Sequence, residues 1–177
     1  METLPILILV FIMIKTYKKF PLTPFSYIVI YIGSVLVFIG AHYSYQHVPI
    51  FDLLKEIFEW ERNNYDKLGH FFQGVVPFII SREYFIRYRL INSKKLMDFL
   101  ALSFSVALSA LWEIIEWLSV VTLMHFGSDK PASAFLGAQN YYWDAQSDIF
   151  FALLGALSAL IIFGKYHERK IHSLLPT

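Results

Sequence analysis

Cysteine is absent from this chain of 177 residues, and charged residues are scarce. Without cysteine the protein cannot be a disulfide scaffold, a thiol enzyme, a cysteine zinc finger or an iron–sulfur protein. Charged residues make up 16% of the chain, against about 25% in soluble domains. The net charge of +1 excludes an electrostatic nucleic-acid binder. No Gly-rich phosphate loop and no His-Glu-x-x-His pattern occurs.

Apolar residues take the place of the missing charge. They account for 56% of the chain, aromatic residues account for 18%, and the mean hydropathy is +0.51. This composition excludes a soluble globular domain, a disordered chain, a collagen-like repeat and a coiled coil. It predicts an all-α protein, a multi-pass bundle of transmembrane helices in one integral membrane domain over residues 1–177.

Five segments are predicted to span the membrane, because a span needs about 20 mostly apolar residues. They are residues 3–15, 24–43, 66–85, 96–124 and 142–164. The first is short, but lysines follow it instead of preceding it, which argues against a signal peptide. Pro49 opens a segment, residues 49–62, with apolar residues on one face and charged residues on the other. This pattern predicts an interfacial helix that lies on the membrane.

Lysine and arginine are distributed unevenly between the two predicted sides of the membrane. Eleven of the fifteen fall on one side. They are Lys15, Lys18, Lys19, Arg82, Arg87, Arg89, Lys94, Lys95, Lys165, Arg169 and Lys170. The positive-inside rule assigns that side to the cytoplasm. The N-terminus is then predicted outside and the C-terminus inside.

Acidic and histidine residues occur in same-face pairs within three predicted spans. Asp66 and His70 are four residues apart, and Gln73 follows one turn later. The other pairs are Glu113 with Glu116 and Asp144 with Asp148. Residues three or four apart share a helix face. The topology places all three pairs in the outer half of the membrane, and His42 ends the second span at the same level.

Charges at this depth need compensation, since a charged side chain at mid-membrane costs about 2.5–3.5 kcal/mol on insertion scales. The carboxyl groups must be protonated, paired with cations or bridged by a metal. Lys67 and Arg62 are the nearby cations. Oxygen ligands with histidine suit a divalent metal such as Mg, Mn, Fe or Zn. The candidate metal ligands are His70, Glu113, Glu116, Asp144 and Asp148, with His42 and Gln73 as possible additional residues.

The remaining histidines and small residues receive simpler interpretations. His47, His125, His167 and His172 fall in predicted loops or tails and are interpreted as surface residues. Arg82 and Glu83 are interpreted as a local pair at the inner boundary. Small residues on the fifth span predict close helix packing. They are Gly155, Ala156, Ser158 and Ala159.

The polar residues also carry a resemblance to a known family. Three segments carry it: Tyr65-Asp66-Lys67-Leu68-Gly69-His70-Phe71-Phe72-Gln73-Gly74, Ser109-Ala110-Leu111-Trp112-Glu113 with Glu116-Trp117, and Phe135-Leu136-Gly137-Ala138-Gln139 with Trp143-Asp144 and Asp148. These segments resemble the signatures of the YjdF-like family of bacterial inner-membrane proteins. The resemblance implies a bacterial multi-pass inner-membrane protein and no particular function. The order of Asp66-Lys67-x-x-His70, Glu113-x-x-Glu116 and Asp144-x-x-x-Asp148 is also distantly similar to VanZ-like proteins.

Three functional interpretations remain open. The first is a metal-dependent enzyme that hydrolyses a phosphate or ester of a lipid-linked substrate, with Asp66 and Glu113 as catalytic candidates. Its di-iron variant lacks the expected Glu-x-x-His motif. The second is a small proton- or cation-coupled transporter, which at this size calls for a homo-oligomer, or a lipid-head-group-binding protein. The third is a scaffold whose buried polar network fixes helix packing. Membrane lipids are partners in every case.

Overall fold

The computed structural model describes residues 3–126 and 141–175, and every regular element in these ranges is helical. The elements are α1 (Leu4–Thr16), α2 (Pro24–His42), α3 (Pro49–Ile57), α4 (Tyr65–Arg87), α5 (Lys94–His125), α7 (Asp144–Ser158), the π-helical turn η1 (Ala159–Phe163) and α8 (Gly164–His172). The predicted all-α class is confirmed. The polar motif at residues 135–139 lies outside the described ranges.

Within the described ranges, three helices are long and apolar enough to cross a membrane. They are α2, α5 and the continuous helix Asp144–His172, which joins α7, η1 and α8. The apolar helix α1 has 13 residues and is shorter than a span. Helix α4 has 23 residues but carries several charges. Beyond the three apolar helices, the count of five spans stays a prediction.

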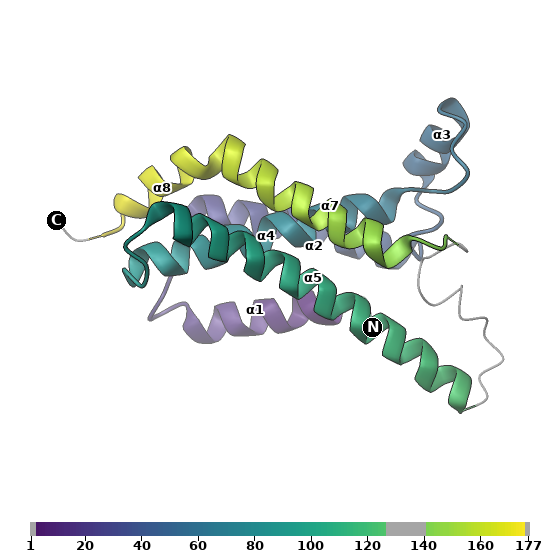
Figure 1. The fold of residues 1–177 in the computed structure, drawn as a ribbon, viewed down its shortest axis with the longest axis horizontal. Helices are drawn as coiled ribbons and strands as arrows, with labels where there is room; N and C mark the ends of the chain where they lie inside the picture. Colours follow the sequence, from purple (N-terminus) through teal and green to yellow (C-terminus); the bar gives the residue numbers. More distant parts are fainter. Residues whose placement is uncertain (1–2, 127–140, 176–177) are drawn as a thin grey trace.

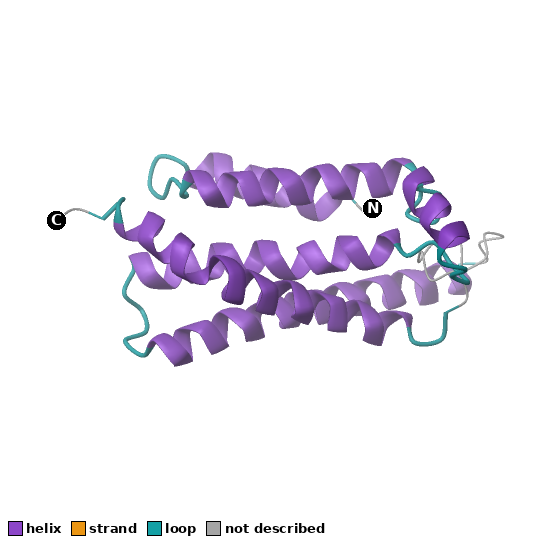
Figure 2. Cartoon of the chain, turned by 90° about the horizontal axis from the view of Figure 1, so that it is seen from above, coloured by secondary structure: helices purple, strands orange, loops and turns teal. Residues whose placement is uncertain are grey.

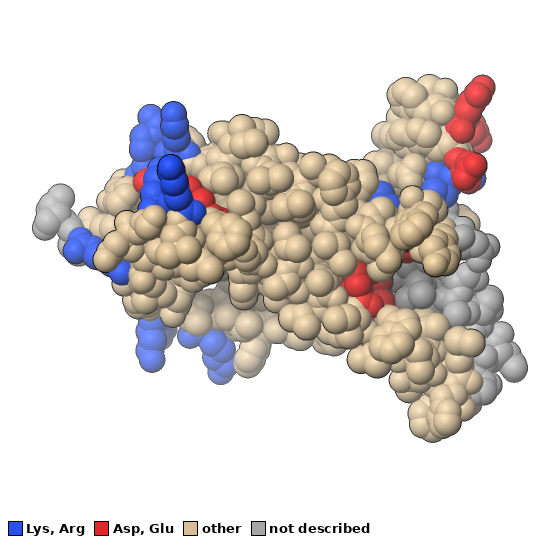
Figure 3. Space-filling view, in the orientation of Figure 1, with Lys and Arg blue, Asp and Glu red and all other residues tan. Residues whose placement is uncertain are grey.

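Helix α4 lies at the centre of the bundle, with α2, α5 and α7 packed around it (Figures 1 and 2). It runs parallel to α7 and antiparallel to α5. The amphipathic helix α3 stands away from the bundle at one end and is shorter than the predicted segment 49–62. On the face shown in Figure 3, lysine and arginine side chains gather at the opposite end, beside α8, and a few lie near α3. We call the end beside α3 the acidic end and the end beside α8 the basic end.

The backbones of α4 and α7 touch at two glycines. A Cβ atom added to Gly74 would lie 1.8 Å from the carbonyl oxygen of Ala152, and one added to Gly155 would lie 1.9 Å from that of Phe71. Ala156 and Ala159 are also buried, which confirms the predicted close packing of this helix. Small residues allow such an approach because no side chain separates the two helices.

Arg82 and Glu83 are both fully buried at the basic end, and the predicted local pair between them is wrong. The Arg82 guanidinium binds Asp98 of α5 at 2.8 Å, Glu168 of α8 at 2.8 Å and the carbonyl of Gly164 at 3.1 Å. Neighbouring residues on a helix point about 100° apart, so Glu83 faces a different helix. Its carboxylate accepts hydrogen bonds from the backbone N–H of Thr23 at 2.8 Å and the hydroxyl of Ser26 at 2.5 Å.

His167 is fully buried, so its interpretation as a surface residue is wrong. Its Nε2 atom lies 3.1 Å from the Ser26 hydroxyl and 3.3 Å from the Glu83 carboxylate. The helix continues past residue 164 as α8, and this places His167 on one face with Gly164 and Ile171. His47, His125 and His172 are exposed, as predicted.

The contact between α4 and α7 predicts a specific sensitivity to a single added methyl group. We expect Gly74→Ala to lower the free energy of unfolding by about 1–3 kcal/mol, the usual cost of overpacking. Detergent-purified protein unfolded by heat or by SDS provides the measurement. Gly69→Ala on the same helix is the control, since its Cβ would meet nothing closer than Tyr45 at 3.4 Å. Equal stability of the two variants would contradict the backbone contact.

Candidate functional site

A cluster of charged side chains is buried between α4 and α7 at the acidic end. Helix α4 supplies Asp66, Lys67 and His70, and α7 supplies Asp144 and Asp148. Each acidic or histidine pair is four residues apart on its helix and therefore projects from one face. Asp144 is half-buried, and the other four are buried. We call these five residues, together with Arg62, the acidic cluster.

Two cations neutralise one side of the acidic cluster. The Lys67 ammonium lies 2.5 Å from Asp148 Oδ1 and 3.0 Å from Asp144 Oδ1. Arg62 donates to Asp144 Oδ1 at 2.7 Å and lies 3.7 Å from Asp66 Oδ2. The ring of Tyr141 packs against both cations, with centroid distances of 5.2 Å to Arg62 and 5.7 Å to Lys67. The two cations named from the sequence are thus the ones that pair with the aspartates.

Asp66 and Asp148 each turn their other carboxylate oxygen toward His70. Nε2 of His70 lies 3.4 Å from Asp66 Oδ1 and 3.8 Å from Asp148 Oδ2. Asp66, His70 and Asp148 each offer one ligand atom, and these three atoms lie within 4.8 Å of one another. The geometry therefore separates a cation-bound side of the carboxylates from a side that converges on one imidazole nitrogen.

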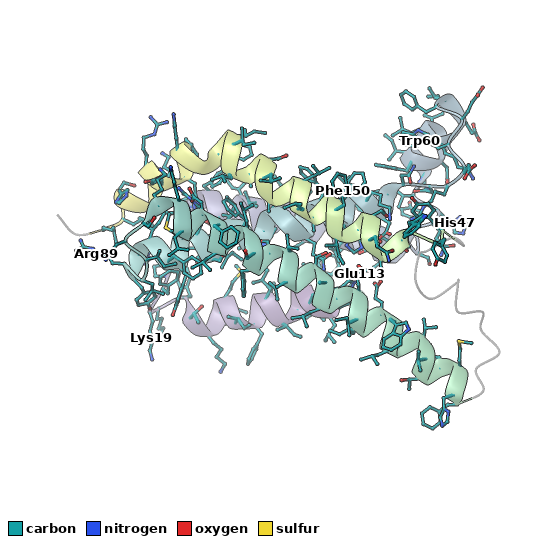
Figure 4. All side chains as sticks on the ribbon, in the orientation of Figure 1. Lys19, His47, Trp60, Arg89, Glu113 and Phe150 are labelled. Carbon is teal, nitrogen blue, oxygen red and sulfur yellow. The ribbon has the colours of Figure 1, made fainter. Side chains whose placement is uncertain are left out.

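The other ring nitrogen of His70 faces helix α5. His70 Nδ1 lies 3.6 Å from Glu113 Oε1, and neither atom has a hydrogen-bond partner among the described residues. Both side chains are more than nine-tenths buried, with exposed fractions of 8% for His70 and 9% for Glu113. Ser109, one turn before Glu113, has a buried hydroxyl that likewise lacks a partner within residues 3–126 and 141–175. Figure 4 shows Glu113 on α5 where this helix crosses α7.

The structure does not bring every candidate residue into contact with the cluster. Glu116 is half-buried and forms no ion pair within the described part of the chain. Gln73 is half-buried on α4, one turn past His70. His42 is exposed at the end of α2, where its ring packs edge-on against Tyr43.

Around His70, two carboxylates of the acidic cluster face Nε2, and the carboxylate of Glu113 faces Nδ1. Imidazole and carboxylate are ligands for Zn, Mn and Fe, and carboxylates alone favour Mg and Ca. A histidine that binds metal through one nitrogen commonly donates its other N–H to a carboxylate. Glu113, which the sequence indicated as a direct ligand, lies 3.6 Å from the far nitrogen of His70.

Comparison with known proteins also indicates a membrane protein over nearly the whole chain. The family described as "Predicted membrane protein (DUF2238)" matches residues 1–169. The inner membrane protein YjdF of Escherichia coli (strain K12) is 38% identical over 171 residues, which cover 97% of this chain and 79% of YjdF. These matches do not show the similarity to VanZ-like proteins, and no solved structure matches. Because the match extends over nearly its whole length, the chain belongs to the DUF2238 family of predicted membrane proteins, in agreement with its YjdF-like signatures.

Proposed function

We propose that Asp66, His70 and Asp148 bind a divalent metal ion, and that the metal activates water for hydrolysis of a phosphate or ester bond in a lipid-linked substrate of the cell envelope. The observation that carries the metal site is the convergence of two carboxylate oxygens on Nε2 of His70 while Nδ1 and Glu113 face each other without a hydrogen bond. Unpartnered buried polar atoms are costly, and a bound ion that fixes the His70 tautomer would satisfy them.

The spacing of the ligand atoms supports this assignment. Two ligands at about 2.1 Å from one ion lie about 3.0 Å apart in octahedral geometry and about 3.4 Å apart in tetrahedral geometry. The distances from His70 Nε2 to Asp66 and Asp148 are 3.4 and 3.8 Å. Three protein ligands leave at least one position for water, which is the pattern of catalytic metal sites.

The proposed reaction needs a water molecule, a base and a leaving group. Water oxygen bonds to phosphorus or to the ester carbonyl carbon, and the bond to the leaving oxygen breaks. The proton released by water passes to a carboxylate and then to the leaving oxygen. Asp66 is the candidate base through Oδ2, which lies 3.7 Å from Arg62, because its Oδ1 faces His70, where the metal would bind.

Metal content tests the site directly. We expect purified wild-type protein to bind one equivalent of Zn²⁺ or Mn²⁺, and His70→Ala to bind less than about a tenth as much, because one of three ligands is lost. His42→Ala is the matched control, since this histidine is exposed and lies outside the cluster. Elemental analysis after dialysis gives the stoichiometry. Equal metal in both variants, or none in the folded wild-type protein, would overturn the proposal.

Glu113 is expected to position His70 and not to bind the metal itself. We expect Glu113→Ala to weaken metal binding by about 10- to 100-fold, the usual effect of losing the carboxylate behind a histidine ligand. Glu116→Ala should leave the affinity within about threefold, because Glu116 makes no ion pair with His70. Competition with a chelating dye measures both affinities. A larger loss in Glu116→Ala would show that the assignment of these two residues is reversed.

We also propose that the basic end faces the cytoplasm and that the acidic end faces outward. The gathering of lysine and arginine beside α8 supports this orientation. The absence of cysteine permits a clean test by single-cysteine labelling. In intact cells, a membrane-impermeant maleimide should label Glu61→Cys, and should label Ser173→Cys only after permeabilisation, since both positions are exposed. The reverse pattern would exclude this topology.

A further inference from the structure

An open pocket of about 420 Å³ lies at the basic end, between the start of α5 and the helix α8. It is lined by Lys94 of α5 and by Lys165, Glu168, Arg169 and His172 of α8. The four residues of α8 follow the spacing of a single helix face, since residues three or four apart lie above one another. Most of the side chains that line the pocket are therefore cations, and they come from two helices far apart in the sequence.

The carboxylates at this pocket are already paired with cations. Glu168 accepts a hydrogen bond from the Arg82 guanidinium at 2.8 Å, and the Lys94 ammonium binds the same carboxylate oxygen. Arg82 also donates to Asp98 at 2.8 Å through its Nε atom. Two cations thus balance two carboxylates, and Glu168 and Asp98 leave no net negative charge at the pocket.

Two other cations of the pocket have no such balance. Lys165 and Arg169 are exposed, and neither forms an ion pair with a residue in the described ranges. The carboxylate of Glu83, which is also at the basic end, is fully buried, pairs with Arg87 and accepts a hydrogen bond from Thr23. Lys165 and Arg169 therefore give the pocket two uncompensated positive charges, which favour an anionic ligand.

Exposed apolar side chains begin close to the pocket on both helices. Phe99 of α5 lies five residues after Lys94 and is exposed. Ile161 and Ile162 of η1 lie four and three residues before Lys165 and are exposed as well. A ligand at this place meets cations at the helix ends and apolar side chains nearer the middle of the bundle. A phospholipid has this arrangement, with a phosphate above its acyl chains, and basic pockets between membrane-spanning helices are typical sites for anionic head groups.

We propose that this pocket binds the head group of one anionic phospholipid, with its phosphate at Lys165 and Arg169 and its acyl chains along the apolar residues of α5 and η1. Hydrogen bonds between ionised donors and a phosphate are stronger than neutral ones, and burial of the chains adds a contribution that a free phosphate lacks. The inference is independent of the proposed metal site, which lies at the acidic end.

Native mass spectrometry of the full chain in a neutral detergent measures the choice of ligand. We expect dioleoyl phosphatidylglycerol to bind about tenfold more tightly than dioleoyl phosphatidylcholine, which has the same chains but no net charge. Glycerol 3-phosphate, which lacks the chains, should bind about tenfold more weakly than phosphatidylglycerol. Equal binding of the two lipids would overturn the role of charge, and equal binding of glycerol 3-phosphate would overturn the assignment to a lipid.

A matched pair of double variants tests the location. Lys165→Gln with Arg169→Gln should weaken phosphatidylglycerol binding by about tenfold or more, because each lysine or arginine near an anionic lipid contributes about fivefold. Lys95→Gln with Lys170→Gln removes the same charge from exposed positions at the same end, but neither residue lines the pocket. This control should change the affinity by less than about threefold. Equal losses in the two double variants would show a diffuse attraction to the basic end and would overturn the pocket.

Discussion

The backbone contact between α4 and α7 is the constraint on which the rest of the structure depends. Gly74 and Gly155 let the two helices approach until one backbone touches the other. At that separation, short aspartate side chains on α7 can reach Lys67 and His70 on α4. A wider separation would leave these charges without partners in a medium that lacks water.

Buried charge is compensated in different ways at the two ends of the bundle. At the basic end, Arg82 is satisfied by two carboxylates and a backbone carbonyl, and Glu83 by hydroxyls, a backbone N–H and His167. Such closed networks fix helix packing, because breaking one partner leaves an uncompensated charge. At the acidic end the aspartates are bound by cations on one side only, and the atoms between His70 and Glu113 lack partners among the described residues. His167 Nδ1 at the basic end likewise lacks a partner among the described residues, so the two ends differ in how their carboxylates are paired. The Glu83 carboxylate accepts several hydrogen bonds, whereas Asp66 and Asp148 each turn one oxygen toward His70.

The acidic cluster lies beside an open groove of about 640 Å³. Lys67 connects the two, since its ammonium binds Asp144 and Asp148 while its side chain lines the groove. The aromatic ring of Tyr141 packs against Lys67 and Arg62. The buried charges and the groove therefore lie at the same end of the α4–α7 pair.

The sequence by itself determined the helical class, the small residues of the packed face and the same-face pairs of Asp66 with His70 and Asp144 with Asp148, because all of these follow from composition and helical period. It also indicated which end of the bundle holds them. Only the tertiary structure decided the partners. It placed Glu113, and not Glu116, beside His70, paired Arg82 and Glu83 with different helices, and buried His167. Spacing along one helix fixes the face that a residue shares, whereas the rotation and identity of the neighbouring helix depend on packing between segments far apart in the chain.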